Sequence, residues 1–253
     1  MLTAAPLLAL VACSAFKADP SNLAQPQMTK QLKFKKTQKL DVNYLLFLPA
    51  DYSRKSAKTW PLILFLHGAG ERGTDVRKVA IHGPPKYVAE HPDFPFILVS
   101  PQCPEGKLWS NDVLLALLEE IVEKYKVDKG RIYLTGMSLG GYGTWNLGLT
   151  SPERFAAIAP ICGGAQMIAV SLTSREKPLA LKSLPVWAFH GAKDPVVLIE
   201  ESQRVIEALQ KIGSKDVKLT VYPDTGHNSW TKTYDNPQLY EWFLQHERRI
   251  PKT

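Results

Sequence analysis

The sequence of 253 residues predicts an α/β fold, in which a mostly parallel sheet is covered by helices on both faces. Short, continuous apolar segments such as residues 61–67 and 185–190 have the pattern of strands that are buried on both faces. Between such segments lie residues 111–125 and 197–212, whose apolar side chains recur at helical spacing. The alternation of these two patterns is typical of parallel sheets, whose functional residues gather at the carboxyl ends of the strands.

The first strand is expected at residues 41–49, and we predict that it pairs with residues 32–37 as a hairpin. Gly130 is expected to interrupt regular secondary structure before a short strand at residues 131–136. The last strand alternates apolar and polar residues, as a half-exposed edge strand does. The strands expected after the first are, in order, residues 61–67, 96–100, 131–136, 155–161, 185–190 and 217–222.

Three helices are expected from periodicity and from their end signals. Residues 111–125 form the first, and Gly213 stops the second, at residues 197–212. Asn236 and Pro237 suit the N-cap and first position of a closing helix that runs to about residue 247. The longest connection, residues 163–184, is expected to be irregular and could cover part of a site.

Composition excludes several classes of protein. The 31 basic and 24 acidic residues give a net charge of +7, but the basic residues form no dense block with interleaved aromatic residues. Nucleic-acid binding is therefore not expected. The three cysteines, Cys13, Cys103 and Cys162, are too few and too scattered for a disulfide scaffold or a zinc site. No metal and no cofactor is expected.

The N-terminal residues have the pattern of an export signal. Residues 2–16 carry no charge and are mostly apolar, and residues 10–13 resemble a lipobox, in which Cys13 would become lipidated. Cleavage after Ala15 is the competing interpretation, and the lack of Lys or Arg before Lys17 departs from both. We expect a signal peptide at residues 1–15, a linker at 16–29 and one catalytic domain at 30–253. The chain would then be periplasmic or extracellular, with membrane contact only through a lipid anchor.

The strongest chemical motif is G-x-S-x-G at residues 136–140, which follows an expected strand and precedes a glycine-rich helix start. Such a turn exposes the Oγ of Ser138, while the following helix N-terminus favours a developing negative charge. A serine needs a base and an acid to act as a nucleophile, expected here in the chain order serine, acid, histidine.

Asp194 and His227 fit that order, because each follows a late strand by a short loop. Asp224 is a rival acid only three residues before the base, but a residue on a separate loop can contact Nδ1 and leave Nε2 free for Ser138. His67 and His190 stand at strand ends, and we expect them to bond the backbone. The other histidines are expected in loops or at the surface, namely His82, His91 and His246.

An oxyanion hole needs two backbone amides that point at one position. One is expected from Leu139, directly after the nucleophile, and the other from Ala69, in the glycine-rich loop after residues 61–67. Gly70 is the near alternative to Ala69.

Together these motifs resemble a known family. The segments that carry the resemblance are HGAGERG, SPQCPEG followed by LW, RIYLTGMSLGGYGTW, PICGG, FHGAKDPVV and TGHNSW. They are similar to the serine α/β-hydrolases of the bacterial phospholipase/carboxylesterase ("predicted peptidase") group, which is related to the feruloyl and acetylxylan esterases of carbohydrate esterase family 1. The resemblance covers about residues 32–245. It implies an α/β-hydrolase fold, Ser138 as nucleophile, Asp194 as acid, His227 as base, and no metal.

Trp109 and Trp230 are the candidates for substrate binding. An exposed aromatic ring beside the site would stack on a sugar or aryl ring of the substrate. The alternative is that each ring only packs under a loop. Tyr142 and Trp145, after the nucleophile, are expected in the core. Cys103 and the later Cys162 are expected to be free, since their strands should not be neighbours.

Three functions are compatible with these residues. The first is a serine ester hydrolase for acetyl, feruloyl or other short or aryl esters, free or on a polysaccharide, because no large insertion forms a lid. The second is a serine peptidase of the prolyl-oligopeptidase type, since fold and triad do not define the substrate. The third is a non-catalytic binding protein, against which the complete set of catalytic residues argues. The oligomeric state does not follow from the sequence.

Overall fold

The computed structural model describes residues 41–55 and 57–248. The predicted signal peptide at 1–15, with Cys13, and the linker at 16–29 lie outside these residues. So do residues 32–37, the predicted hairpin partner of the first strand. These predictions stay predictions.

The centre of the described part is a seven-stranded sheet in the order β1-β3-β2-β4-β5-β6-β7. All neighbouring strands run parallel except β1, which is antiparallel to β3. The α/β-hydrolase fold is thereby confirmed. The strands are β1 Tyr44–Phe47, β2 Trp60–Leu66, β3 Ile97–Pro101, β4 Val127–Met137, β5 Ala157–Ile161, β6 Val186–Gly191 and β7 Val217–Tyr222.

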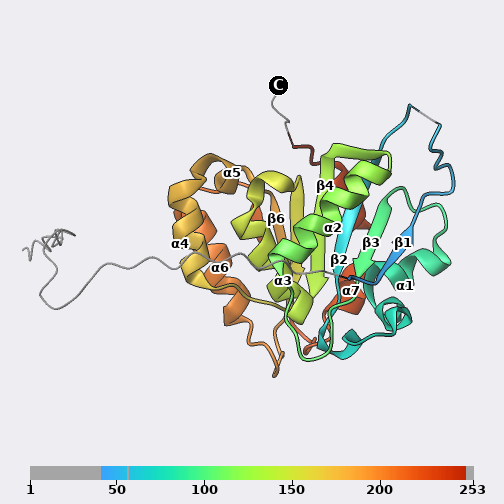
Figure 1. Ribbon diagram of the computed structural model, residues 1–253. Helices are drawn as coiled ribbons and strands as arrows, with labels where there is room; N and C mark the ends of the chain where they lie inside the picture. The colour runs from blue at the N-terminus through green and yellow to red at the C-terminus, as the bar shows by residue number, and fades with distance from the viewer. Residues whose placement is uncertain (1–40, 56, 249–253) are drawn as a thin grey trace, which may run out of the picture. The chain divides into compact units, whose positions relative to one another are not determined.

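Helices cover the sheet, with α2 and α3 lying in front of it in the view of Figure 1. Among the described helices, none is both long and apolar enough to cross a membrane. The α-helices are α1 Gly83–Glu90, α2 Asn111–Lys124, α3 Leu139–Thr150, α4 Met167–Glu176, α5 Pro178–Ser183, α6 Glu200–Lys211, α7 Trp230–Tyr234 and α8 Pro237–Leu244. Three 3₁₀ turns are η1 Ala69–Glu71, η2 Val76–Ile81 and η3 Pro152–Arg154.

The hydrophobic core consists of two layers, one on each face of the sheet. Successive side chains of a strand point to opposite faces, so Leu62 and Leu64 of β2 enter one layer while Ile63 and Phe65 enter the other. The first layer contains the apolar faces of α2, α3 and α6, and the second contains that of α8. Because both faces are covered, the inner strands β2 and β5 are apolar at every position, as the sequence indicated.

Several predicted boundaries are wrong. Residues 163–184 are not irregular but contain α4 and α5. β4 begins at Val127 and runs through Gly130, whose amide donates to Asp128 Oδ1 (2.9 Å), so a local side-chain contact replaces the expected break. The helix expected at 197–212 begins only at Glu200, because the amide of Val197 is bound by the carboxylate of Asp194 instead.

The order of the strands defines where a site can form. From β2 the chain moves to β3 on one side and then crosses to β4 on the other. A crevice therefore opens at the carboxyl ends of β2 and β4. Cys103 and Cys162 are free and buried, and they follow β3 and β5, which β2 and β4 separate.

Candidate active site

Ser138 stands on a strained turn between β4 and α3. Its backbone has φ 53° and ψ −115°, outside the regions that most residues occupy, and its amide donates to the Ile161 carbonyl (3.0 Å). Strain of this kind is common where a fold holds a reactive side chain in place. Gly140 is required for the turn, because a Cβ there would collide with the carbonyl group of Leu66 at the end of β2.

The structure brings Ser138, His227 and Asp194 together from the ends of β4, β7 and β6. His227 Nδ1 lies 2.7 Å from Asp194 Oδ2, and His227 Nε2 lies 2.9 Å from Ser138 Oγ. An ionised carboxylate only accepts hydrogen bonds, so Nδ1 carries the proton of a neutral ring. Nε2 is then free to accept the proton of the serine hydroxyl.

Asp194 is buried, and its side chain is held on several sides. Its Oδ1 accepts from the amides of Val196 (2.9 Å) and Val197 (3.0 Å). Burial alone would raise the pKa of Asp194, but the hydrogen bonds from His227 and these amides outweigh it, so the pKa lies below the ordinary value. His190 Nε2 also approaches Oδ2 to 3.3 Å, a contact that the sequence did not indicate.

The rival acid lies elsewhere. Asp224 is exposed and pairs with Lys193 (2.9 Å). His67 and His190 bond backbone carbonyls, as expected. His91 and His246 also bond main-chain carbonyls, away from Ser138.

The loop after β2 passes directly against the nucleophile. A Cβ built on Gly68 would lie 3.7 Å from Ser138 Cβ. His67 braces this loop, because its Nδ1 contacts the Gly68 carbonyl (2.6 Å) and its Nε2 accepts from the Cys103 amide (3.0 Å). The ring is fully buried, and burial lowers the pKa of His67, so it stays neutral.

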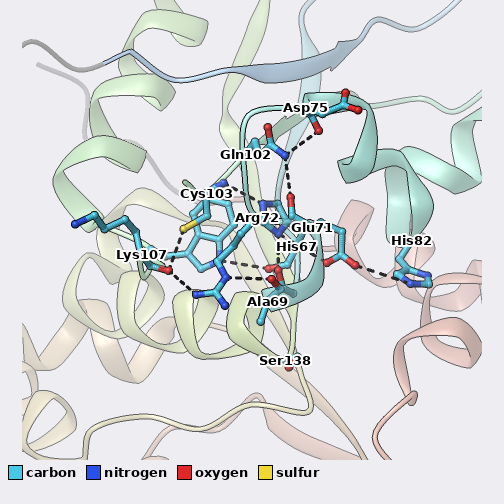
Figure 2. Close-up of polar contacts among 12 residues, drawn as sticks. His67, Ala69, Glu71, Arg72, Asp75, His82, Gln102, Cys103, Lys107 and Ser138 are labelled. Atoms are coloured by element: carbon cyan, nitrogen blue, oxygen red, sulfur yellow. Dashed lines mark hydrogen bonds and ion pairs between the residues drawn. The ribbon is translucent and has the colours of Figure 1, made fainter. Parts of the chain in front are cut away.

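The two predicted amide donors stand at the beginnings of helical turns. Leu139 begins α3, and Ala69 begins η1 on the Ser138 side of the loop (Figure 2). Arg72 Nε donates to the Ala69 carbonyl (3.0 Å), and its Nη1 donates to that of Lys107 (3.3 Å). This clamp joins the loop to the segment that follows β3.

Trp109 lines a cavity of about 310 Å³ beside Leu139. The indole Nε1 donates to the His67 carbonyl (3.3 Å), and the ring packs edge-to-face on His67. Tyr142 also lines the cavity, which corrects the expectation that it belongs to the core, whereas Trp145 is fully buried. The remaining lining comes from Leu108, Gly143, Asn146, Gly164, Ala165 and Gln166.

Trp230 packs against His227 and does not line the cavity beside Leu139. Its ring packs edge-to-face on His227, with centroids 5.3 Å apart, and at 5.8 Å from the ring of His82. His82 lies in the bend between η2 and α1, as expected for a loop residue, and it faces Glu71 (Figure 2). Neither His82 nor Glu71 was predicted as a site residue, and only their position near the glycine-rich loop could have suggested them.

Cys162, Asp194 and His227 bring metal-ligand atoms within 4.8 Å of one another. Burial raises the pKa of the Cys162 thiol to about 12, and the other two side chains bond each other. A metal would need the thiolate and the free histidine nitrogen. The arrangement fits proton transfer between Ser138 and His227 better than metal binding.

Residues 110–238 match the family model described as phospholipase/carboxylesterase. An acyl-protein thioesterase 1 from Mycosarcoma maydis is 32% identical over 111 residues, which are 43% of this chain and 45% of that protein. A bifunctional acetylxylan esterase/xylanase from Neocallimastix patriciarum is 25% identical over 126 residues, which are 50% of this chain and 17% of that protein. The chain thus spans less than half the length of these relatives.

Among solved structures, that of a thermostable esterase is similar over most of the described residues. Its TM-score is 0.65 at 35% sequence identity, with 83% of this chain and 60% of that chain covered.

Proposed function

The chain belongs to the phospholipase/carboxylesterase family, and on this basis we propose that it is a serine hydrolase that cleaves carboxylic esters through an acyl-enzyme. One observation carries the proposal, namely the continuous hydrogen bonding from Asp194 through His227 to Ser138. The family to which the chain belongs and the thermostable esterase, as a similar structure, support the same class of reaction.

In the first half of the reaction, Ser138 Oγ attacks the ester carbonyl while His227 Nε2 takes its proton. Asp194 keeps the His227 ring in the correct tautomer and stabilises the imidazolium that forms. The amides of Leu139 and Ala69 stabilise the negative charge on the carbonyl oxygen. His227 then returns the proton to the leaving alcohol, and the acyl group stays on Ser138.

In the second half, water takes the place of the alcohol. His227 Nε2 removes a proton from the water as it attacks the acyl-enzyme, and the same two amides stabilise the second oxyanion. The proton then returns to Ser138 Oγ as the acid product leaves. No step needs a metal or a cofactor.

The cavity beside Leu139 favours a small or aryl acyl group. Its volume of about 310 Å³ is near the lower end of ligand pockets, roughly 300–1,000 Å³. Trp109 and Tyr142 offer aromatic faces for a planar acid such as ferulate. An ester on a polysaccharide is compatible with this site, and the acetylxylan esterase relative supports it. The acyl-protein thioesterase relative makes short thioesters a second candidate.

The test compares hydrolysis of p-nitrophenyl acetate, p-nitrophenyl palmitate, methyl ferulate and an S-acetyl thioester. We expect the acetate or ferulate esters to be cleaved and the palmitate to be a poor substrate. Ser138→Ala should remove most of the rate, roughly 10³-fold or more. Ser171→Ala, at an exposed serine of α4, is the matched control and should keep full activity.

Three outcomes would contradict the proposal. Full activity of Ser138→Ala would exclude this serine as the nucleophile. Cleavage of a peptide anilide with no ester hydrolysis would favour a peptidase. Lack of irreversible labelling by an organophosphonate would favour a binding protein.

Export is also proposed, from the apolar residues 2–16 and the lipobox-like residues 10–13. The intact mass of the mature protein after expression in a bacterial host separates the alternatives. Lipidated Cys13 as first residue and cleavage after Ala15 give different masses, and an uncleaved chain in the cytoplasm would contradict export.

A further inference from the structure

Glu71 is a buried acidic side chain close to the nucleophile. It is 8% exposed, and its Oε2 has no hydrogen-bond partner among the residues that the structure describes. A Cβ built on Gly68 would lie 3.2 Å from this oxygen and 3.7 Å from Ser138 Cβ. Buried polar atoms without partners are costly, so each of them needs a physical explanation.

His67, the nearest histidine, does not satisfy this carboxylate. Its Nδ1 lies 3.8 Å from Glu71 Oε2, beyond hydrogen-bond distance. Its Nε2 accepts from Cys103, so the single proton of the neutral ring is on Nδ1 and is donated to the Gly68 carbonyl. The ring therefore has no proton to give to Glu71.

The Glu71 carboxylate does not stabilise the loop in which Glu71 lies. The Gln102 side-chain amide donates to the carbonyls of Glu71 (2.9 Å) and Asp75 (2.8 Å). Arg72 holds the neighbouring Ala69 carbonyl from outside (Figure 2). With the main chain held by other residues, the side chain of Glu71 is available for a different role.

His82 faces the other oxygen of Glu71 across a gap. Its Nε2 lies 3.9 Å from Glu71 Oε1, too far for a direct hydrogen bond. A single oxygen atom between them could lie at ordinary hydrogen-bond distance from both. The His82 side chain is 34% exposed, so this position is open to solvent. A hydroxyl group fits it, because it can donate to the carboxylate and contact the ring nitrogen.

The gap is connected to His227 through the ring of Trp230. His82 packs on Trp230, and Trp230 packs on His227, which gives its proton to the leaving oxygen. The apolar cavity at Leu139 and Trp109 contacts neither Glu71 nor His82. With the acyl group in the cavity, as proposed above, the gap remains for the alcohol.

We infer that Glu71 and His82 bind a second hydroxyl group of the leaving alcohol, so that the chain prefers esters of diols and polyols to esters of simple alcohols. This inference rests on the proposed ester hydrolysis at Ser138. It assigns the specificity for the alcohol to residues outside the triad.

The test compares the acetate esters of ethylene glycol, 2-methoxyethanol and choline. The first alcohol carries a hydroxyl donor, the second is similar in size without a donor, and the third carries a positive charge without a donor. We expect kcat/KM for the glycol ester to exceed that for the methoxy ester by roughly tenfold, as a hydrogen bond to a charged group would give. Glu71→Gln should bring this ratio close to one, because it lowers kcat/KM for the glycol ester more than for the methoxy ester.

Two further variants complete the design. His82→Phe keeps the ring that packs on Trp230 and removes the nitrogen, so it should reduce the same ratio if Glu71→Gln fails to fold. Glu105→Gln, at an exposed glutamate, is the matched control and should keep the preference.

Each other outcome overturns the inference. Equal cleavage of all three esters by the wild type leaves the proposed esterase in place but removes the hydroxyl site. Preference for the choline ester means that Glu71 recognises charge. An equal loss on every ester in Glu71→Gln indicates a general structural role. No cleavage of any ester removes the proposed function together with this inference.

Discussion

At the scale of single residues, Asp194 shows how the fold stabilises an ionised group. Its carboxylate accepts from two main-chain amides and from His227, contacts that an unfolded chain lacks. The folded pKa therefore lies below 3.8, the value of the free carboxyl. A group with a depressed folded pKa stabilises the fold fully above its unfolded pKa, and this contribution is lost as pH falls through the folded pKa.

Asp194→Asn should consequently be less stable than the wild type at pH 6, with a difference in the free energy of unfolding that shrinks below about pH 4. The same variant should lose roughly 10³–10⁴-fold in kcat, because the amide no longer holds the tautomer of His227. Urea unfolding at pH 3 and pH 6 measures the first effect.

Asp224→Asn is the matched control, since Asp224 is exposed and its pair with Lys193 contributes at most about 1 kcal/mol. A stability difference for Asp194→Asn that is the same at both pH values would contradict the role assigned to ionisation.

At the scale of elements, the close packing of α3 against β2 and β4 determines the position of the Ser138 side chain in the site. Gly136 and Gly140 allow three main-chain segments to approach, and a Cβ on Gly136 would lie 2.5 Å from the Gly140 carbonyl oxygen. Main chain cannot rotate out of the way as a long side chain can. The turn is therefore intolerant of even one added methyl group.

Gly140→Ala should lower the free energy of unfolding by about 3 kcal/mol or more and reduce esterase activity, because α3 must shift away from Leu66. Gly70→Ala is the matched comparison for stability, since a Cβ there meets nothing within 4 Å and its φ is not positive. Denaturant unfolding of the two variants measures the effect. Equal stability would contradict the steric argument.

The elements themselves differ in how well the sequence predicts them. Inner strands such as β2 are apolar at every position because both faces are covered, so they stand out as continuous segments. α4 was missed because only Val170 and Thr173 of its residues are buried, which leaves almost no helical period. α1 was missed because Pro84 and Pro85 suggest a loop, although proline suits the first turn of a helix.

The residues of the site also differ in how well the sequence predicts them. Ser138, Asp194 and His227 follow strands, and parallel strands bring their carboxyl ends to one edge, so their meeting was predictable. Glu71 and His82 lie in turns after β2, where the direction of a side chain depends on packing against distant segments such as Trp230. No local pattern encodes that direction.

At the scale of the whole molecule, the described residues contain both core layers and a sheet of seven strands, β1 to β7. Its two edges differ. β7 has no fully buried residue, and Lys218 and Val221 are exposed, as suits an edge strand. β1 is half-buried at all four positions and pairs only with β3 among the described strands. The outer edge of β1 is where the predicted hairpin partner, residues 32–37, would bind.

Two shortened chains test this prediction. A chain that begins at Lys30 keeps residues 32–37, and a chain that begins at Leu40 lacks them but retains both core layers. We expect both to fold and to cleave the same esters, because every residue of the proposed site follows β2. Loss of one edge pairing worth about 1 kcal/mol should lower the Tm of the shorter chain by roughly 2–4 °C. It should also expose the edge of β1 to association between molecules. Thermal unfolding and light scattering of the two chains measure these effects, and identical Tm values would mean that residues 32–37 do not pair with β1.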